Sequence, residues 1–441
     1  MKSARNFFYG LTAQFLNIGF GILIIPIASI KLSPEILGIW FLFFTLQSFV
    51  MIFFNSVSDI FPNYFTNFLT KKKLTKELNL NTNKFHVLLK STSLINLLFT
   101  TFILLIFILF AFFYIPLISS QISNQISNIY ISIAIFATST ALDGLSMHYV
   151  YALRGTGNQK YWYISTIMAR ITQLMLSIYF LNIGYGLLGL TAAYLISNIL
   201  KFFLRLAFFR QVEKQLEISF EKYQFIEIIQ TIQAYKKTIF KLFATQVSTF
   251  FTLRSAPFFI SYALSLETSS MYSIAQTIIN TLHSVSRVVV QNYQQHFVVA
   301  LSDIQKKLSI LRRSLLFTST IYFFGAMVSI LFLDYFLVFI GSNIKSLPSE
   351  FLILMFIFNY FEMISSFSIF YILSYGKVPF MKASLISGCL IIFFQFIAVS
   401  TTYNTLLFIL LAQYLVQISY NNWRWPLYLI KKSNYGDQSI Q

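Results

Sequence analysis

The segment KFFLRLAFFRQVEKQLEISFEKYQFIEIIQTIQAYKKTIFK, from Lys201 to Lys241, determines how the rest of the chain is interpreted. It contains eight of the 32 Lys and Arg residues and four of the 14 acidic residues, and long apolar stretches lie on both sides of it. A charge-dense segment between two apolar halves predicts a polar connection between two membrane domains.

Apolar residues recur within this segment at intervals of three and four, which places them on one face of a helix. They are Val212, Leu216, Phe220, Tyr223, Ile226, Ile229 and Ile232. The opposite face carries Lys and Glu, a pattern typical of a helix that lies on a membrane surface. A solvated connector helix is the alternative.

Composition indicates a membrane protein. Of 441 residues, 57% are hydrophobic and only 10% charged, with 52 Phe and a mean hydropathy of +0.70, whereas a soluble domain carries about 25% charge. The net charge of +18 does not indicate a nucleic-acid partner, because the Lys and Arg residues occur in short loops between apolar blocks. The lone Cys389 excludes an intramolecular disulfide. The apolar run Phe7–Ile30 is too long for a signal peptide, so we expect a retained first helix.

The chain supplies twelve candidate membrane spans, each long enough for a crossing of about 20 residues. They are Phe7–Ile30, Ile36–Phe61, Thr92–Leu117, Ile129–Leu153, Trp162–Leu181, Leu187–Phe209, Ile239–Leu264, Met271–Val299, Leu315–Ile340, Phe351–Tyr375, Phe380–Val399 and Leu406–Tyr428. We therefore predict an all-α polytopic membrane protein. Its expected parts are a six-helix lobe (1–209), an amphipathic cytoplasmic hinge (210–238), a second six-helix lobe (239–430) and a cytoplasmic tail (431–441).

Positive charge predicts the orientation. With both termini inside, 27 of the 32 Lys and Arg residues fall on the cytoplasmic side, including all eight of the central segment. The outer face keeps only Lys31 and Lys345, and the positive-inside rule favours this arrangement.

The two halves resemble copies of each other. A shift of 232 residues aligns identical residues in the first and seventh spans and in the turns after them, for example Gln14 with Gln246 and Glu35 with Glu267. Six spans per half would relate the copies by a pseudo-two-fold axis along the membrane normal, with a shared cavity between them. Chance similarity between Phe- and Ile-rich helices is the alternative.

Polar residues inside the spans mark candidate functional sites, because such groups are costly in hydrocarbon and face protein or water. The candidates for binding substrate in a cavity are Arg170, Gln246, Arg254, Asn280, Arg287 and Gln291. The acids Asp59, Asp143 and Glu362 are candidates for ion coupling. Guanidinium groups bind phosphate or carboxylate in a two-pronged way, so the arginines favour an anionic substrate. Alternatively, they pair with the three acids and lock helices together.

Motifs for other chemistry are absent from the sequence or misplaced in it. The pattern GYGLLG, Gly184–Gly189, matches a dinucleotide motif but has no preceding strand, and no phosphate-binding loop for ATP occurs. The four His residues show no metal-ligand spacing with one another or with Cys389. We expect no cofactor, no metal and no enzymatic activity.

The chain resembles the Wzx-type flippases of bacterial polysaccharide synthesis, within the larger group that includes multidrug and toxin extrusion (MATE) transporters. Three segments carry the resemblance: LSPEILGIW at Leu32–Trp40, VSDIFP at Val57–Pro62 and ALRGTGNQKY at Ala152–Tyr161, which contains Gly155. The first is similar to the family's start of span two, and the last to its loop after span four.

The resemblance implies a flippase that moves an undecaprenyl-diphosphate-linked oligosaccharide across the bacterial cytoplasmic (inner) membrane by alternating access, for O-antigen or capsule synthesis. A polysaccharide polymerase and a chain-length regulator are further candidate partners. The first alternative is a MATE-type cation-coupled antiporter of drugs or small molecules, in which the acids would carry the substrate. The second is a membrane scaffold or polymerase subunit.

Overall fold

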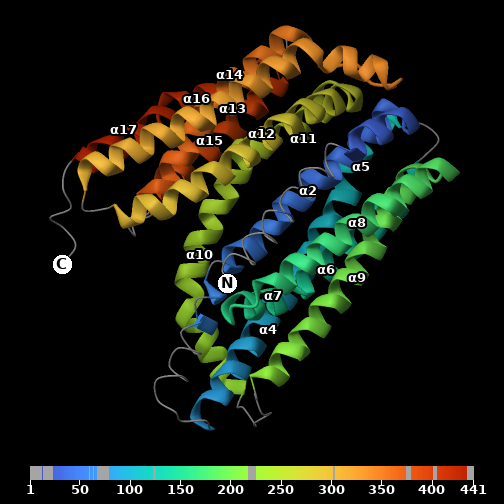
Figure 1. Ribbon diagram of the computed structural model, residues 1–441. Coiled ribbons are helices and arrows are strands. Elements are labelled where there is room, and N and C mark those ends of the chain that lie inside the picture. The colour runs from blue at the N-terminus through green and yellow to red at the C-terminus, as the bar shows by residue number, and fades with distance from the viewer. Residues whose placement is uncertain are drawn as a thin grey trace. The chain divides into compact units, whose positions relative to one another are not determined.

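The computed structural model describes residues 12, 23–58, 60–62, 64–66, 79–122, 126–216, 225–300, 303–373, 379–400 and 405–434. The regular elements of this part of the chain are helices, and no strand occurs in it (Figure 1). They are α2 (Pro34–Ser58), α4 (Asn79–Leu109), η1 (Phe110–Tyr114), α5 (Ile115–Ile118), η2 (Ser119–Gln121), α6 (Ile126–Leu145), α7 (Met147–Gly155), α8 (Gln159–Ile183), α9 (Gly186–Gln215), α10 (Phe225–Arg254), α11 (Ala256–Ala263), α12 (Leu266–Val299), α13 (Ile304–Phe339), α14 (Ser349–Leu373), α15 (Met381–Ser400), α16 (Thr405–Ser419) and α17 (Asn421–Asn434). The predicted all-α class is confirmed.

Within the described residues, eight helical segments are long and apolar enough to cross a membrane. They are Pro34–Ser58, Lys84–Gln121, Ile126–Gly155, Gln159–Ile183, Gly186–Gln215, Ile304–Phe339, Ser349–Ile372 and Met381–Ser400. Each coincides with a predicted span, so the chain is a multi-pass membrane protein. Most of the predicted first span lies outside the described residues. The other three predicted spans fall on α10–α11, α12 and α16–α17, which are interrupted or carry polar stripes, and the count of twelve stays a prediction.

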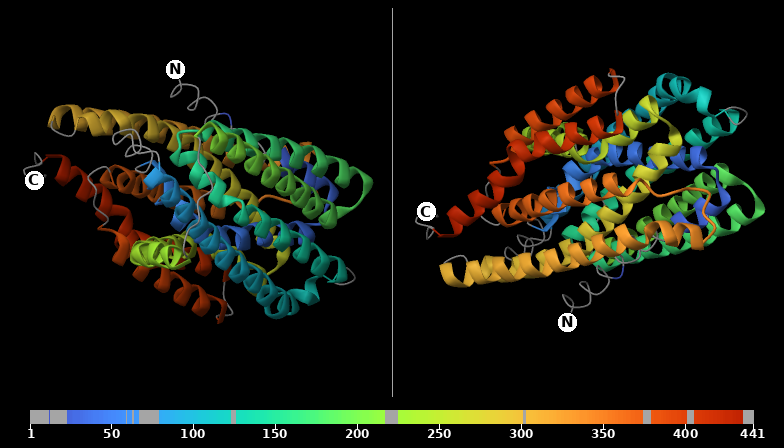
Figure 2. Two further views of the ribbon diagram at one scale, coloured as in Figure 1. Left: turned by 90° about the horizontal axis from the view of Figure 1, so that it is seen from below. Right: turned by 90° about the horizontal axis from the view of Figure 1, so that it is seen from above.

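The chain divides into two compact units, each described by itself below. Unit 1 comprises Met1–Leu32 and Leu42–Gln246, and unit 2 comprises Ser33–Phe41 and Val247–Gln441. In unit 1, α9 packs lengthwise against both α6 and α8, and α4 packs against α6 (Figure 1). In unit 2 the closely packed pairs are α12 with α13, α15 with α16, and α14 with α17 (Figures 1 and 2).

An aromatic and aliphatic cluster at one end of unit 1 joins α2, α4, α7 and α9. Its buried members are Val57, Phe61, Phe65, Phe85, Leu88, Leu89, Ile95, Tyr151, Ala152 and Phe209. The first half of α10 packs against this cluster through Ile232, Tyr235 and Ile239, and the ring centroids of Tyr235 and Tyr64 lie 4.2 Å apart. These α10 side chains are partly buried against the cluster, and this apolar contact holds α10 onto unit 1.

The buried face of α10 differs in part from the predicted apolar face. Ile232 contacts the cluster and Ile228 is buried, but Ile226 and Ile229 are 58% and 37% exposed. Ile226 and Ile229 therefore do not take part in the contact with the cluster, and their position on a membrane surface stays a prediction. The contact face runs through Ile228, Ile232, Tyr235 and Ile239, at spacings of four, three and four. Phe220 and Tyr223 lie outside the described residues.

Candidate functional site

Two polar stripes face each other inside unit 1 where α6 and α9 pack together. On α9 the stripe follows spacings of four, three and four, and on α6 it follows spacings of four and three, so each lies on one helical face. The α9 stripe is Tyr194, Asn198, Lys201 and Arg205, and the α6 stripe is Ser139 and Asp143 with Ser146 just after the helix end. Polar groups are costly in hydrocarbon, and the two stripes provide each other with polar partners.

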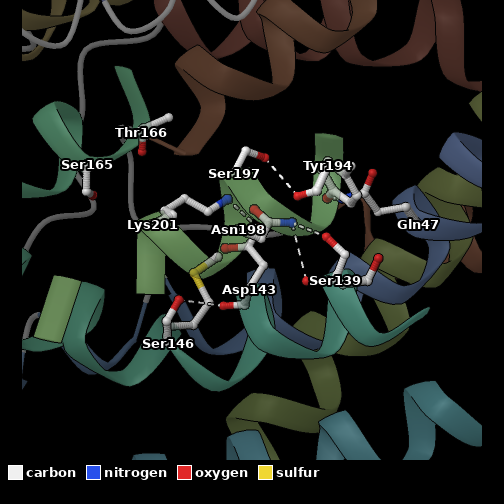
Figure 3. Close-up of polar contacts among 12 residues, drawn as sticks. Gln47, Ser139, Asp143, Ser146, Ser165, Thr166, Tyr194, Ser197, Asn198 and Lys201 are labelled. Atoms are coloured by element: carbon white, nitrogen blue, oxygen red, sulfur yellow. Dashed lines mark hydrogen bonds and ion pairs between the residues drawn. The ribbon is translucent and has the colours of Figure 1, made fainter. Parts of the chain in front are cut away.

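Asp143 accepts contacts from two cations of α9 at the centre of this site. Its Oδ2 atom lies 2.8 Å from Lys201 Nζ, and its Oδ1 atom lies 2.8 Å from Arg205 Nη1 (Figure 3 shows Asp143 and Lys201). The side chains of Lys201, Asp143 and Arg205 are 11%, 7% and 3% exposed. These three ion-paired residues are here called the charged triad.

Arg205 forms further hydrogen bonds, but one of its donor atoms has no partner. Arg205 Nη1 also donates to Ser146 Oγ and lies 3.9 Å from Met147 Sδ, whereas Arg205 Nε is buried with no hydrogen-bond partner. One turn along α9, Asn198 Nδ2 donates to Ser139 Oγ at 2.8 Å (Figure 3). The network continues to Tyr194, whose hydroxyl accepts from Gln47 Nε2 of α2.

The charged triad carries a net charge of +1, since it contains two cations and one carboxylate. A buried ion pair is stable only when the partners satisfy each other, and removal of one partner leaves an uncompensated charge that costs about 3–5 kcal/mol. The excess positive charge and the unpartnered Nε atom indicate a site of positive potential inside the membrane-spanning part of unit 1.

Lys201 and Arg205 are not among the site residues predicted from the sequence, because they fall in the basic connecting segment. The structure continues α9 through both residues to Gln215, and both are buried against α6. The available signal was their spacing: Tyr194, Asn198, Lys201 and Arg205 lie four, three and four residues apart, which places them on one helical face.

Arg170, on α8 in unit 1, is half-buried and donates from Nη1 to Gln173 Oε1 at 2.8 Å. Gln173 is itself buried, so this contact fixes Arg170 along its own helix. Gln246, on α10, is half-buried. The predicted binding residues are divided between the two units, because Arg170 and Gln246 belong to unit 1 and the other four belong to unit 2.

Arg254 lies at a break in the seventh predicted span, in unit 2. It is the last residue of α10, its side chain is exposed, and α11 begins two residues later with Pro257 in its first turn. Proline has no N–H to continue the helical hydrogen bonds, which explains the break. A cation is favourable at the carboxyl end of a helix, where carbonyl groups are left without helical partners.

Arg287 is exposed on α12 of unit 2, on a face with Gln276, Asn280 and Ser284. Gln276 Nε2 donates to Asn280 Oδ1 at 3.3 Å, and Ser284 Oγ donates to the Asn280 carbonyl at 2.7 Å. These residues form a polar stripe along α12 up to Arg287. The side chain of Gln291, the next predicted member, lies outside the described part of the structure.

The three acidic residues predicted for ion coupling differ in their surroundings. Asp59 lies outside the described residues. Asp143 belongs to the charged triad, so both of its oxygen atoms are engaged by Lys201 and Arg205 rather than by any predicted binding arginine. Glu362, on α14 of unit 2, has a buried Oε2 atom with no hydrogen-bond partner. Within unit 1, Asp143 therefore pairs with Lys201 and Arg205 and not with Arg170, because α6 packs against α9.

Gly155 ends α7 in a tight contact with the segment that follows α2. A Cβ atom there would lie 2.3 Å from Phe65 Cβ and 2.6 Å from the Pro62 carbonyl oxygen. Thr66 Oγ1 donates to the Gly155 carbonyl at 2.9 Å, and Arg154 Nη1 donates to the Ser58 carbonyl at 3.0 Å. The segment Ala152–Tyr161, one of the three that carry the family resemblance, thus has a packing role here. Within the described residues, no group of three His, Cys, Asp or Glu side chains could hold a metal ion.

A comparison with protein-family models and with curated proteins finds no match for this sequence. Solved structures do match over nearly the whole chain. An inward-facing multidrug resistance MATE family transporter of the MOP superfamily has a TM-score of 0.62 at 13% identity, with 97% of this chain and 96% of that chain covered. The lipid II flippase MurJ, in an inward closed conformation, has a TM-score of 0.66 at 18% identity, with 97% and 87% covered.

A third structure, a mutant of the Vibrio cholerae MATE transporter VcmN, has a TM-score of 0.53 at 12% identity, with 98% and 96% covered. All three identities are low, so the comparisons concern the fold. The chain has the fold of the MATE-like transporters of the MOP superfamily.

Proposed function

We propose that this protein is a flippase that moves an undecaprenyl-diphosphate-linked oligosaccharide across the bacterial cytoplasmic membrane by alternating access. The substrate would supply O-antigen or capsule synthesis, with a polysaccharide polymerase and a chain-length regulator as partners. The fold supports this proposal, because it includes both MATE transporters and a lipid flippase. Fold alone does not define substrate, so the choice rests on the site.

The observation that carries the proposal is the exposure of Arg254 and Arg287 within predicted spans of unit 2. An arginine in a membrane-spanning helix is costly unless it faces water or has an anionic or protein partner, and an exposed guanidinium is accessible to an anionic substrate. A diphosphate offers several acceptor oxygens to the planar guanidinium fork, and Asn280 and Gln276 on the same stripe can bond sugar hydroxyls. The net positive charged triad of unit 1 adds to the preference for an anion.

Ion coupling, in this proposal, belongs to Glu362. Its Oε2 atom is buried without a partner, so the group can change protonation without first breaking an ion pair. Asp143 is less suited to ion coupling, because Lys201 and Arg205 both form ion pairs with its carboxylate. The substitution Glu362→Gln is expected to leave substrate binding intact and to make flipping independent of the ion gradient.

A MATE-type antiporter of small molecules is the second candidate, favoured by the match to MATE transporters. It predicts that acids, rather than Arg254 and Arg287, are required for binding. The deciding experiment measures which leaflet holds the lipid-linked glycan in cells with and without the gene, beside their sensitivity to cationic drugs. Accumulation of the lipid-linked glycan in the inner leaflet of cells without the gene supports the flippase. Increased drug sensitivity of cells without the gene, with no such accumulation, supports the antiporter.

A further inference from the structure

His283 of α12 joins the exposed polar stripe of this helix to the interior of unit 2. It follows Asn280 by three residues and precedes Arg287 by four, so it shares a helical face with both. Its side chain is half-buried, whereas Arg287 is exposed. The imidazole also contacts α13 and α14, which both pack along α12. It therefore lies between a candidate anion-binding arginine and the buried part of the unit.

The hydrogen bond of His283 defines which ring nitrogen can gain a proton. His283 Nε2 lies 3.0 Å from the carbonyl oxygen of Asn359 on α14. A carbonyl oxygen only accepts, so Nε2 carries the hydrogen of the neutral imidazole, and Nδ1 is the atom that gains a further proton. Nε2 keeps its hydrogen in the imidazolium as well. Protonation therefore changes the charge at this position without breaking the contact between α12 and α14.

The neighbours of His283 fix the position of its ring. Asn359 is buried, and its Nδ2 atom lies 3.4 Å from the hydroxyl oxygen of Tyr414 on α16. On α13 the ring centroid of Tyr322 lies 5.6 Å from that of the imidazole, and the Tyr322 hydroxyl donates to the Phe356 carbonyl at 2.9 Å. The imidazole is thus held next to α14 by groups that have partners of their own.

Two charged residues lie on the helix turns next to His283, among the described residues of unit 2. Arg287 follows it by one turn on α12, and Glu362 follows Asn359 by one turn on α14. The other titratable groups around it are the phenols of Tyr322 on α13, Tyr360 on α14 and Tyr414 on α16. The third helix packed along α12, α11, has no charged residue, and its Tyr262 is 49% exposed. Arg287 is therefore the nearby cation that disfavours a positive charge on the imidazole.

We propose that His283 takes up a proton when an anionic diphosphate binds Arg287. The bound anion offsets the charge of the guanidinium and favours a cation one turn away, at Nδ1 of His283. By reciprocity, a protonated His283 strengthens the binding of the diphosphate. The proton comes from water, and no covalent bond of the substrate changes. This inference rests on the proposed function, because it takes the lipid-linked diphosphate as the ligand of Arg287.

The proton has a use in the passage of the substrate. A diphosphate diester carries a negative charge on each phosphate, so one guanidinium leaves a charge unmatched, and the imidazolium supplies the second cation. Matching the charge lowers the cost of moving the headgroup through the membrane. A proton that drives export by exchange has to compete with the substrate, whereas this proton accompanies it. Ion coupling therefore stays with Glu362 in the proposed function.

The test uses the purified full-length protein in detergent and a synthetic decyl diphosphoryl-N-acetylglucosamine. Both phosphates of this diester stay ionised between about pH 6 and 8, the range in which histidine titrates, so the probe itself exchanges no protons. Isothermal titration calorimetry in two buffers of different ionisation enthalpy counts the protons taken up per bound molecule. We expect an uptake of about half a proton or more near pH 6.5, and an affinity that falls about tenfold between pH 6 and 8.

His283→Gln separates titration from packing, because glutamine keeps an Nε2 donor for the Asn359 carbonyl but gains no proton. Proton uptake should disappear in this variant, and its affinity should no longer depend on pH. His148→Gln is the matched control. His148 also contacts a backbone carbonyl, with Nδ1 2.7 Å from the Leu145 oxygen, but the residue one turn later is Ala152. Its proton uptake should equal that of the wild type.

Binding of the probe by the wild type without proton uptake overturns the inference, and so does equal uptake by His283→Gln. Uptake that is lost in Glu362→Gln but kept in His283→Gln also overturns it and assigns the proton to Glu362. Where His283→Gln does not fold, the ring carbon signals of the four histidines in the wild type report protonation directly by NMR. Failure to bind the probe contradicts both the inference and the proposed substrate. Proton-linked binding by a protein that flips no glycan supports the inference and contradicts the proposed function only.

Discussion

Asp143 on α6 and Arg205 on α9 are joined by an ion pair of 2.8 Å in which both side chains are buried. The same carboxylate also meets Lys201, so one acid neutralises two cations across a helix–helix contact. Removal of a surface charge is usually tolerated, but removal of this one leaves two bases in a nonpolar interior.

The first prediction concerns Asp143. Asp143→Asn is expected to reduce the amount of folded protein in the membrane, because it leaves two buried cations uncompensated at a cost of about 3–5 kcal/mol. The double substitution Asp143→Asn with Lys201→Met should recover part of the loss, since it removes one of those charges. Fluorescence size-exclusion chromatography of a tagged protein measures the folded fraction.

The control for this prediction is Glu350→Gln, which neutralises an exposed acid at the start of α14. Its folded fraction should match the wild type. Equal folding of Asp143→Asn and Glu350→Gln would show that the charged triad does not stabilise unit 1.

The second prediction separates binding from folding at Arg254 and Arg287. Both side chains are exposed, so Arg254→Ala and Arg287→Ala should leave the folded fraction unchanged while transport falls at least about tenfold. Lysine keeps the charge without the fork and should restore transport only in part. Flipping of lipid-linked glycan is measured beside membrane protein level. Arg424→Ala, at another exposed arginine of unit 2, is the control, and a loss of folded protein in the Arg254 or Arg287 variants would argue for a structural role.

The third prediction tests the packing of the loop after α7. Gly155→Ala places a methyl group 2.3 Å from Phe65 Cβ and should destabilise unit 1 by about 1–3 kcal/mol, because the backbone of Pro62 cannot move away cheaply. Gly157→Asn is the contrasting change. Gly157 has a φ of 74° and nothing within 4 Å of an added Cβ, and asparagine tolerates the left-handed conformation. Thermal unfolding should separate the two variants, and equal melting temperatures would contradict the packing role.

The sequence predicted the membrane class because apolar length alone requires helices in a bilayer. It also located Asp143, Asn280 and Arg287 as polar residues within apolar spans, since polarity is a local property. It did not predict that Asp143 faces Lys201 and Arg205, because this depends on which helix packs against α6. Lys201 and Arg205 were not predicted as site residues, because they lie next to other Lys and Arg residues in the charged central segment. Their spacing of four residues nevertheless places them on one helical face.

The last prediction distinguishes the two faces of α10. Ile232 contacts the aromatic cluster of unit 1, whereas Ile226, six residues earlier on the same helix, is 58% exposed. Ile232→Asn should reduce thermal stability by about 1–3 kcal/mol, because it removes a partly buried aliphatic side chain and places an amide against the cluster. Ile226→Asn makes the identical chemical change at an exposed position and should leave the melting temperature unchanged. If the exposed face of α10 lies on the membrane surface, Ile226→Asn will increase protease cleavage near Phe225 in vesicles but not in detergent. Equal cleavage in both media would indicate a solvated connector.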